Sequence, residues 1–192
     1  MSAYCDLAPG HEFHGPYHDH EYGFPVHDDD SLFERLILEI NQAGLSWLTV
    51  LKKRTAFQAA FEGFDIDRVA AYGEPERARL LSDAGIIRNR LKVDAAIHNA
   101  QVIQQLQAEH GSFKAWLDHH HPLPHADWVK LFKRSFRFTG PEIVNEFLMS
   151  SGYLPGAHRD DCPVQARILA AGPPWAETSP RQVGNPVADR HS

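Results

Sequence analysis

The sequence is poor in cysteine and has no long apolar run. Only two of its 192 residues are cysteines, which excludes a framework of disulfides as the basis of the fold. No stretch approaches the roughly 20 consecutive apolar residues that a membrane-spanning helix needs. The segment Met1–Leu7 lacks the basic-then-apolar pattern of a secretory signal. We therefore expect a cytoplasmic protein with no membrane partner.

Basic residues are also fewer than acidic ones. The chain has 25 acidic and 19 basic residues, so its formal net charge is -6. Proteins that bind nucleic acid are more often basic, and the total charge therefore gives no support to that role. The distribution of charge matters more than the total. The basic residues gather in three clusters: Lys52–Arg54, Arg88 with Arg90 and Lys92, and Lys130 through Lys133 and Arg134 to Arg137. Each cluster taken alone is typical of a solvated helix face.

Signals for β-strands are nearly absent, and helical periodicity dominates from Ser31 to Ser151. A hydrophobic content of 43% in a chain of this length supplies one core. We therefore expect an all-α protein with a single domain over residues 1–172. Residues 173–192 are rich in Pro, Ser, Arg and Gly, a composition that favours a flexible tail.

Capping and breaking residues place the expected helices. Ser31 and Glu34 have capping-box spacing, which predicts that a helix begins at Ser31. Gly44 is expected to end that helix, and Pro141 suits the first turn of a later one. The other helices are expected from about residue 46 and over 74–83, 88–109, 113–118 and 127–135, with a linker at 119–124 and a tight turn at 136–140.

Both cysteines have a histidine nearby, one pair toward each end of the chain. Cys5 and His18 lie near the N-terminus, while His158 and Cys162 lie near the C-terminus with H-x3-C spacing. Such a Cys2His2 set suits tetrahedral Zn²⁺. Four protein ligands would leave no open position on the metal, so the zinc would be structural and would tie the two ends together. The spacing alone fits two unrelated buried cysteines with surface histidines equally well.

Four further residues could line one pocket. Glu39 lies at the edge of the apolar stripe of its helix, and Trp47 follows just beyond the Gly44 turn. Tyr17 and Tyr22 offer hydroxyl groups and aromatic faces. A base flipped out of DNA is bound by such faces and by hydrogen bonds to its edge, and a carboxylate favours a cationic base. Taken singly, each of these residues is more simply explained as core or as a surface acid.

Three stretches carry a much more specific pattern. They read YHDHEYG at Tyr17–Gly23, LEINQAGLSWLTVLKKR at Leu38–Arg54 and DAGIIRNR at Asp83–Arg90. They resemble the motifs YHDxEWG, LExxQAGLSWxxxLKKR and DAGIIRxR of the 3-methyladenine DNA glycosylase I family, in the helix-hairpin-helix glycosylase superfamily. The resemblance extends from Cys5 to Cys162. This chain departs from the family at Tyr22, where Trp is usual, and at His14, where another Tyr is expected.

The resemblance implies a helix-hairpin-helix DNA glycosylase fold with two helical lobes and a lesion cleft between them. A zinc site would join the N- and C-terminal segments. The family places its zinc ligands at the positions of Cys5, His18, His158 and Cys162. The activity implied is monofunctional release of cationic 3-methyladenine from double-stranded DNA, which leaves an abasic site. Glu39 would read the base edge and act as the catalytic group, in a pocket lined by Tyr17, Tyr22 and Trp47.

The resemblance also predicts how the chain would contact DNA. The hairpin would lie between Lys133 and Gly140, where exposed amide groups and a helix N-terminus suit a phosphate. Leu45 would fill the gap that a flipped base leaves in the stack, although an ordinary helix-end contact explains the Gly44 turn as well. The expected DNA contacts are Gln42, Gly44, Leu45, Lys133, Arg137 and Gly140.

The expected chemistry needs no strong nucleophile, because methylation already makes the base a good leaving group. We find no lysine placed to form a Schiff base, so strand cleavage is not expected. Related glycosylases carry an Asp where this chain has Asp160 and Asp161, but that region is given over to zinc. We expect a monomer. Two alternatives stay open: a non-catalytic damage-binding protein of the same fold, and a zinc-stapled interaction protein that binds no nucleic acid.

Overall fold

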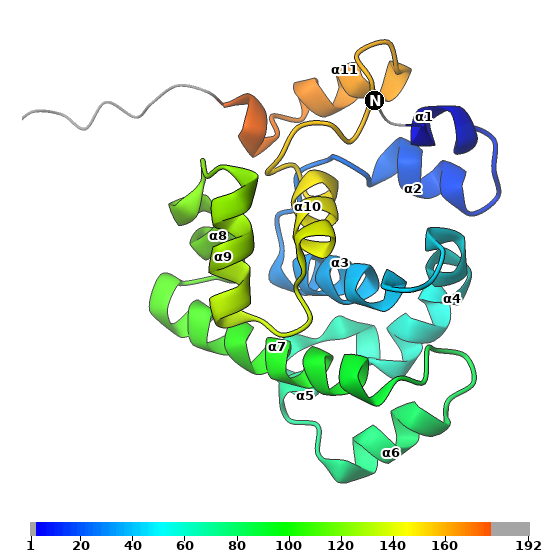
Figure 1. Ribbon diagram of the computed structural model, residues 1–192, viewed down its shortest axis with the longest axis vertical. Coiled ribbons are helices and arrows are strands. Elements are labelled where there is room, and N and C mark those ends of the chain that lie inside the picture. Colours follow the sequence, from blue (N-terminus) through cyan, green and yellow to red (C-terminus); the bar gives the residue numbers. More distant parts are fainter. Residues whose placement is uncertain (1–2, 178–192) are drawn as a thin grey trace, which may run out of the picture.

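The computed structural model describes residues 3–177, and within that range the regular structure is entirely helical (Figure 1). The all-α prediction is therefore confirmed. The elements in chain order are α1 (Tyr4–Leu7), α2 (His14–His20), α3 (Asp29–Gln42), α4 (Trp47–Ala60), the 3-10 turn η1 (Glu62–Phe64), α5 (Ile66–Ala70), α6 (Glu74–Ser82), α7 (Arg90–His110), α8 (Phe113–His120), α9 (His125–Ser135), α10 (Pro141–Ser150), α11 (Pro163–Ala170) and the 3-10 turn η2 (Pro174–Ala176).

Helix α3 lies at the centre of the molecule and contacts α4, α5, α7, α8 and α10. Its start was predicted wrongly. The helix begins at Asp29, and the carboxylate of Asp28 accepts a hydrogen bond from the Ser31 amide at 2.8 Å. A carboxylate at this position satisfies a free amide and also interacts favourably with the helix dipole, so Asp28 caps the helix in place of Ser31. Its end agrees with the prediction, since Gly44 has a φ of +80° just beyond Gln42.

The other predicted helices are all present, with small shifts at their ends. Ser46 caps α4, and Pro141 occupies the first turn of α10, as predicted. Helix α7 begins at Arg90 and α9 at His125, while α8 continues to His120 and so includes two residues of the expected linker. The prediction missed α1, α2, α5 and α11, which have four, seven, five and eight residues.

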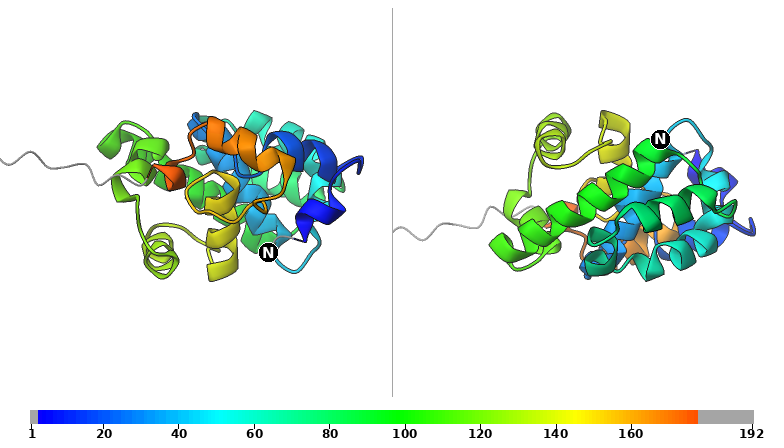
Figure 2. Two further views of the ribbon diagram at one scale, coloured as in Figure 1. Left: turned by 90° about the horizontal axis from the view of Figure 1, so that it is seen from above. Right: turned by 90° about the horizontal axis from the view of Figure 1, so that it is seen from below.

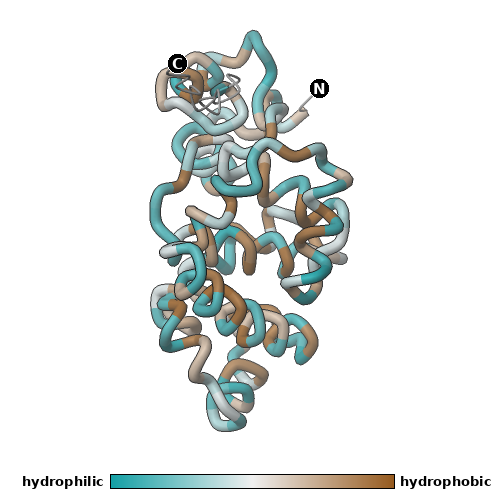
Figure 3. Tube along the Cα trace, turned by 90° about the vertical axis from the view of Figure 1, so that its left-hand side faces the viewer, coloured by the Kyte–Doolittle hydropathy of each residue, from teal (hydrophilic) through white to brown (hydrophobic). Residues whose placement is uncertain are grey.

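One large core fills the space between these helices. The predicted stripe of α3, which includes Phe33 and Leu36, is fully buried. The rings of Phe113, Phe132 and Phe147 pack together where α8, α9 and α10 meet. Figure 3 shows apolar and polar residues alternating along the turns of the helices, the pattern of amphipathic helices that each bury one side.

The two ends of the described chain lie side by side. Helices α1 and α2 lie next to α11 at the top of the molecule in Figure 1. Arg167 on α11 donates to the Asp19 carbonyl at 2.9 Å, and Arg159 pairs with Asp6 at 2.6 Å. Segments about 150 residues apart in the sequence therefore build one surface.

The expected boundary at residue 172 stays a prediction. Pro173 is buried, and the Trp175 amide donates to the Gly152 carbonyl at 3.1 Å, so residues 173–177 contact the domain. The rest of the expected tail, residues 178–192, lies outside the described residues. Over residues 3–177, none of the helices has the length and apolar character needed to cross a membrane.

Candidate active site

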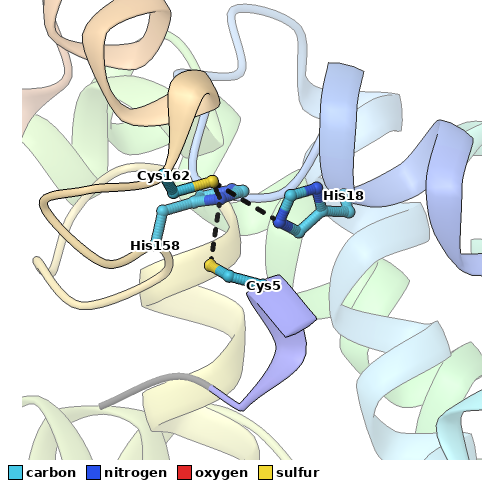
Figure 4. Close-up of side chains that lie close together, drawn as sticks. All are labelled: Cys5, His18, His158 and Cys162. Atoms are coloured by element: carbon cyan, nitrogen blue, oxygen red, sulfur yellow. Dashed lines mark hydrogen bonds between the residues drawn. The ribbon is translucent and has the colours of Figure 1, made fainter. Parts of the chain in front are cut away.

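Cys5, His18, His158 and Cys162 converge in one buried cluster (Figure 4). The four ligand atoms all lie within 4.8 Å of one another. The Sγ atom of Cys162 is 3.4 Å from Nδ1 of His158 and 3.8 Å from Nε2 of His18, and Sγ of Cys5 is 3.7 Å from Nδ1 of His158. The cysteines are not joined in a disulfide. The predicted set of metal ligands is thus brought together, in a geometry that could hold one metal ion.

The remaining nitrogen of each histidine in this cluster is occupied. Nδ1 of His18 donates to the Asp19 carboxylate at 2.7 Å, which leaves Nε2 to face the sulfur atoms. Nε2 of His158 donates to the Tyr22 carbonyl at 2.8 Å, which leaves Nδ1 toward them. Such outer hydrogen bonds fix the ring orientation and the tautomer of a metal-binding histidine.

Beside this cluster, the three aromatic residues expected to line a pocket lie together: Tyr17 on α2, Tyr22 just after α2 and Trp47 at the start of α4. The Tyr17 ring lies 5.1 Å from the Trp47 ring and 5.7 Å from the Tyr22 ring, measured between centroids. Tyr17 is only 2% exposed, yet its hydroxyl has no hydrogen-bond partner. Buried hydroxyl groups are almost always bonded, so the Tyr17 hydroxyl is an exception, which it shares with Trp128 Nε1 in the main core.

Glu39 projects from α3 toward the same region and is only 4% exposed. None of the other described residues forms a hydrogen bond with its carboxyl group. Burial raises the pKa of Glu39 well above its ordinary value, and the nearby Glu146 carboxyl raises it further, while Arg35 opposes the shift. The sequence placed this residue at the edge of the apolar stripe, half-buried, but it is fully buried. The free site therefore holds a carboxyl group that is costly to ionise.

A network of charged groups lies next to the Tyr17 ring. Arg54 binds both carboxylate oxygens of Glu21, at 2.7 and 2.8 Å, and also binds Glu34 at 2.8 Å. Arg35 donates to the carbonyls of Glu21 and Ser150 and lies 5.5 Å from the Tyr17 ring centroid. Since these groups satisfy one another, the network positions the segment that carries the two tyrosines, at the end of α2.

Three residues of the site were missed as site residues by the sequence analysis. Glu146 on α10 accepts a hydrogen bond from the Tyr22 hydroxyl at 3.1 Å, and burial raises its pKa. The Tyr4 hydroxyl is bonded to Nδ1 of His14 at 3.0 Å, and the Tyr4 ring meets the Tyr22 ring edge-on at 5.5 Å. In the sequence, His14 is only a departure from the family pattern, and Tyr4 is notable only for its position directly before Cys5.

The expected DNA contacts lie in two turns. Gln42 is the last residue of α3, and Gly44 and Leu45 lie in the turn that leads to α4, where Leu45 is 44% exposed. Lys133, Arg137 and Gly140 lie at the end of α9 and in the turn before α10, and both cations are exposed. Figure 2 shows the two turns along the same edge of the molecule, the lower edge in the left view. The structure therefore brings these two groups to one side.

Two surface cavities lie away from the aromatic cluster. One, of about 260 Å³, is bordered by the Glu21–Arg54 ion pair and by His27. The other, of about 640 Å³, lies between α8 and α9 and is lined by Leu123, Leu131 and basic residues. Neither of these two cavities is lined by the pocket residues. The rings of Tyr17, Tyr22 and Trp47 instead pack against one another.

Comparison with known proteins agrees with this geometry. The family described as methyladenine glycosylase matches residues 8–127. The chain is 38% identical to DNA-3-methyladenine glycosylase 1 of Escherichia coli over 71% of its own length and 83% of that protein, and 33% identical to DNA-3-methyladenine glycosylase of Haemophilus influenzae over 85% and 98%. The solved structure that describes 3-methyladenine recognition by 3-methyladenine DNA glycosylase I from Staphylococcus aureus has a TM-score of 0.76 at 32% identity, and the match covers 84% of this chain and 95% of that one. The chain therefore belongs to the methyladenine glycosylase family.

Proposed function

We propose that this chain is a monofunctional DNA glycosylase of base excision repair, which flips 3-methyladenine out of alkylated duplex DNA and hydrolyses its N-glycosidic bond. The observation that carries the proposal is an unpartnered polar group in an aromatic cluster beside a buried acid. The Tyr17 hydroxyl is buried without a hydrogen-bond partner among the described residues, and Glu39, which is only 4% exposed, lies near enough to raise the pKa of Tyr17. Unsatisfied groups of this kind destabilise the empty fold, and a bound base edge would satisfy them.

In this mechanism Glu39 selects the lesion by its charge. Burial and the nearby Glu146 carboxyl raise the pKa of Glu39, which makes its charged form costly in the free site. A cationic base favours the ionised carboxylate, since an opposite charge offsets the loss of solvation. The resulting charge-assisted hydrogen bond is unavailable to a neutral base. Trp47, Tyr17 and Tyr22 would supply the faces on which the flipped base stacks.

The bond to the base breaks without a protein nucleophile. The electron pair of the glycosidic bond moves to the base and cancels its positive charge, while water adds to the sugar and releases a proton. The buried amine nearest the turn after α3 is Lys92, but its Nζ donates to the carbonyls of Asn41 and Ala43 at 2.9 and 2.7 Å. Because this amine is held by the backbone, we propose that no Schiff base forms and that the strand stays intact.

We further propose that the metal is a single structural zinc ion. A tetrahedral zinc with Zn–S of about 2.3 Å and Zn–N of about 2.0–2.1 Å places its sulfur and nitrogen ligands roughly 3.6 Å apart. The sulfur–nitrogen distances of 3.4, 3.7 and 3.8 Å in the cluster fit that geometry. All four positions are taken by protein atoms, so the ion would supply stability to the joined ends and no chemistry. His18 lies next to Tyr17, which links the two sites through one helix.

The proposed partner is double-stranded DNA, bound by a monomer in the cytoplasm. Helices α9 and α10 would form the helix-hairpin-helix, with the turn before Gly140 directed at a phosphate. Lys133 and Arg137 have no carboxylate partner among the described residues, which leaves both available to the DNA backbone. On the second turn, Leu45 would fill the gap left by the flipped base, with Gln42 and Gly44 beside it.

The test is base release from alkylated duplex DNA, with each released base identified by chromatography. We expect 3-methyladenine to be released, the DNA strand to remain uncut, and an unmethylated duplex to yield no base. Binding to alkylated duplex without release would instead support a damage-binding protein of the same fold. Failure to bind either duplex would support the zinc-stapled interaction protein and contradict the proposal.

A further inference from the structure

Phe138 lies in the turn between α9 and α10 and has an unfavourable position for an aromatic residue. Its φ is +62°, in the left-handed region that residues with a side chain seldom adopt, and it is 38% exposed. Glycine or asparagine would occupy this backbone position with less strain. Phe64 makes an instructive comparison, because its φ is +58° but its ring is only 1% exposed. Burial in the core accounts for Phe64 and does not account for Phe138.

The hairpin that carries Phe138 is fixed to helix α7. Asn99 on α7 is fully buried, and its side chain makes two hydrogen bonds to the backbone of Arg137, accepting from the amide at 2.8 Å and donating to the carbonyl at 3.1 Å. The residue directly before Phe138 is therefore held at both its amide and its carbonyl. An exposed ring on such a rigid support is presented at little further cost in conformational entropy.

The same helix also fixes the turn that carries Leu45. Lys92 lies seven residues before Asn99, which is two helical turns and so the same side of α7. Its Nζ donates to the carbonyls of Asn41 and Ala43 at the end of α3, and it lies 6.0 Å from the Phe138 ring centroid. One rigid helix therefore sets the spacing between Leu45 and Phe138, the exposed apolar residues of the two turns at one edge of the molecule (Figure 2).

The charges around Phe138 indicate what kind of partner the ring meets. Lys133, Arg134 and Arg137 are all exposed, and none of them is paired with a carboxylate of residues 3–177. Lys130, one turn earlier on α9, is paired with Asp127 at 3.0 Å. An apolar ring among unpaired cations is complementary to duplex DNA, where phosphates flank the apolar faces of sugars and bases.

We propose that Phe138 is a second apolar DNA contact, which packs against the duplex at a distance from Leu45 that Lys92 and Asn99 determine. This rests on the proposed function, because it takes duplex DNA as the partner. It adds an apolar contact to a hairpin for which only phosphate contacts were expected, and it explains why a strained, exposed position carries an aromatic ring.

The test is the affinity of Phe138→Gly for a duplex that contains a stable abasic-site analogue, measured by fluorescence anisotropy. We expect binding about ten-fold weaker, as for the loss of one stacking contact. The dependence of affinity on salt should stay the same, since no phosphate contact is removed. Glycine tolerates the local backbone, so the midpoint of thermal unfolding should be unchanged or higher. Leu169→Ala, a control at a residue on α11 that is 49% exposed, should leave both quantities unchanged.

Unchanged affinity of Phe138→Gly would overturn the inference. If the unfolding midpoint also fell, the ring would serve the stability of the fold. Phe138→Leu keeps an apolar group and should bind with intermediate affinity. The assay reads binding alone, so it separates this inference from the proposed activity. If the unmodified protein releases 3-methyladenine and Phe138→Gly binds DNA as tightly as the unmodified protein, the proposed function stands and only the Phe138 contact is refuted.

Discussion

The Cys2His2 cluster and the proposed base pocket are neighbours built from buried polar groups, and they differ in how those groups are bonded. In the Cys2His2 cluster, both histidines have an outer hydrogen bond, to Asp19 and to the Tyr22 carbonyl. In the proposed pocket, the buried Tyr17 hydroxyl has no partner among the described residues, and burial raises the pKa of the Glu39 carboxyl. Satisfied buried groups rigidify a fold, while unsatisfied ones cost stability until a ligand arrives. Among the described residues, Trp128 Nε1 in the main core is the other buried group without a partner, so the contrast concerns these two neighbouring clusters alone.

Loss of a metal ion from the Cys2His2 cluster should have the largest effect on the free energy of unfolding, because the cluster joins the two ends of the described chain. We expect His18→Ala to lower the free energy of unfolding by about 3 kcal/mol or more, since loss of a structural metal site releases both chain ends. His27→Ala, at an exposed histidine outside the cluster, is the matched control. Thermal unfolding with and without a chelator measures the effect. A chelator that destabilises neither the unmodified protein nor His27→Ala would contradict a structural metal.

The next largest effect is expected for Glu39→Gln, whose effect on the free energy of unfolding should change with pH. Because the raised pKa lets the folded state keep a proton that the unfolded chain releases, stability falls as pH rises above the ordinary carboxyl value of 4.5. Glutamine carries no such penalty, so the stability of Glu39→Gln relative to the unmodified protein should increase with pH. Denaturant unfolding at several pH values measures this trend.

Glu21→Gln is the control, because its effect on stability should follow the opposite trend with pH. Burial acts to raise the pKa of Glu21, but its bonds to Arg54 outweigh burial and lower the pKa overall. Glu21 therefore contributes stability at neutral pH that is lost as pH falls, so Glu21→Gln should destabilise most at neutral pH. If Glu39→Gln follows the trend of Glu21→Gln, then Glu39 forms a structural ion pair and the pocket is not unsatisfied.

Two buried tyrosines, one with a bonded hydroxyl and one without, should differ by a smaller amount in unfolding free energy when each is changed to Phe. The Tyr153 hydroxyl donates to Asp118 at 2.7 Å, whereas the Tyr17 hydroxyl has no partner. Tyr153→Phe should lose about 1.5 kcal/mol of unfolding free energy, as expected for a hydrogen bond to a charged group. Tyr17→Phe should lose none and could only gain, because it removes an unsatisfied buried group. Equal losses in the two variants, measured by denaturant unfolding, would show that the Tyr17 hydroxyl has a partner.

The smallest expected effect is on the salt dependence of DNA binding, and it concerns paired and unpaired cations on α9 and in the turn after it. Lys133→Ala and Arg137→Ala should each lower the slope of log affinity for DNA against log salt by about one unit, as for one lost phosphate contact. Lys130→Ala is the control, because Lys130 is paired with Asp127. Binding to an undamaged duplex at several salt concentrations measures the slopes. Three equal slopes would mean that the hairpin side of α9 does not contact the DNA backbone.

Much of this structure could be predicted from local sequence. The Ser46 cap, Pro141 at the start of α10 and the stop at Gly44 follow from the conformational preferences of single residues. The convergence of Cys5, His18, His158 and Cys162 could be predicted from the family resemblance, whereas their spacing alone fitted unrelated residues equally well. The start of α3 was misplaced because Asp28 and Ser31 are both good caps, and the choice between them is made by the backbone.

The polar contacts of the pocket could not be predicted, because they join distant parts of the chain. Glu146 meets Tyr22 across 124 residues, and Lys92 reaches the Asn41 carbonyl across 51. Nothing local to Glu146 distinguishes it from a surface acid on α10. Likewise, the full burial of Glu39 depends on the helices packed around α3, so the sequence indicated a half-buried acid where the structure has a buried one.

The central claim is that Glu39 selects a cationic base, and the most direct measurement is the excision rate of Glu39→Gln on two lesions. The substrates are a duplex with 3-methyladenine and a duplex with a neutral base that the enzyme removes weakly, compared at a temperature where both proteins are folded. A charge-assisted contact is worth about 1.5–3 kcal/mol, so the rate on 3-methyladenine should fall about ten- to a hundred-fold. The rate on the neutral base should change little. An equal proportional loss on both lesions would contradict the claim and leave Glu39 a structural residue.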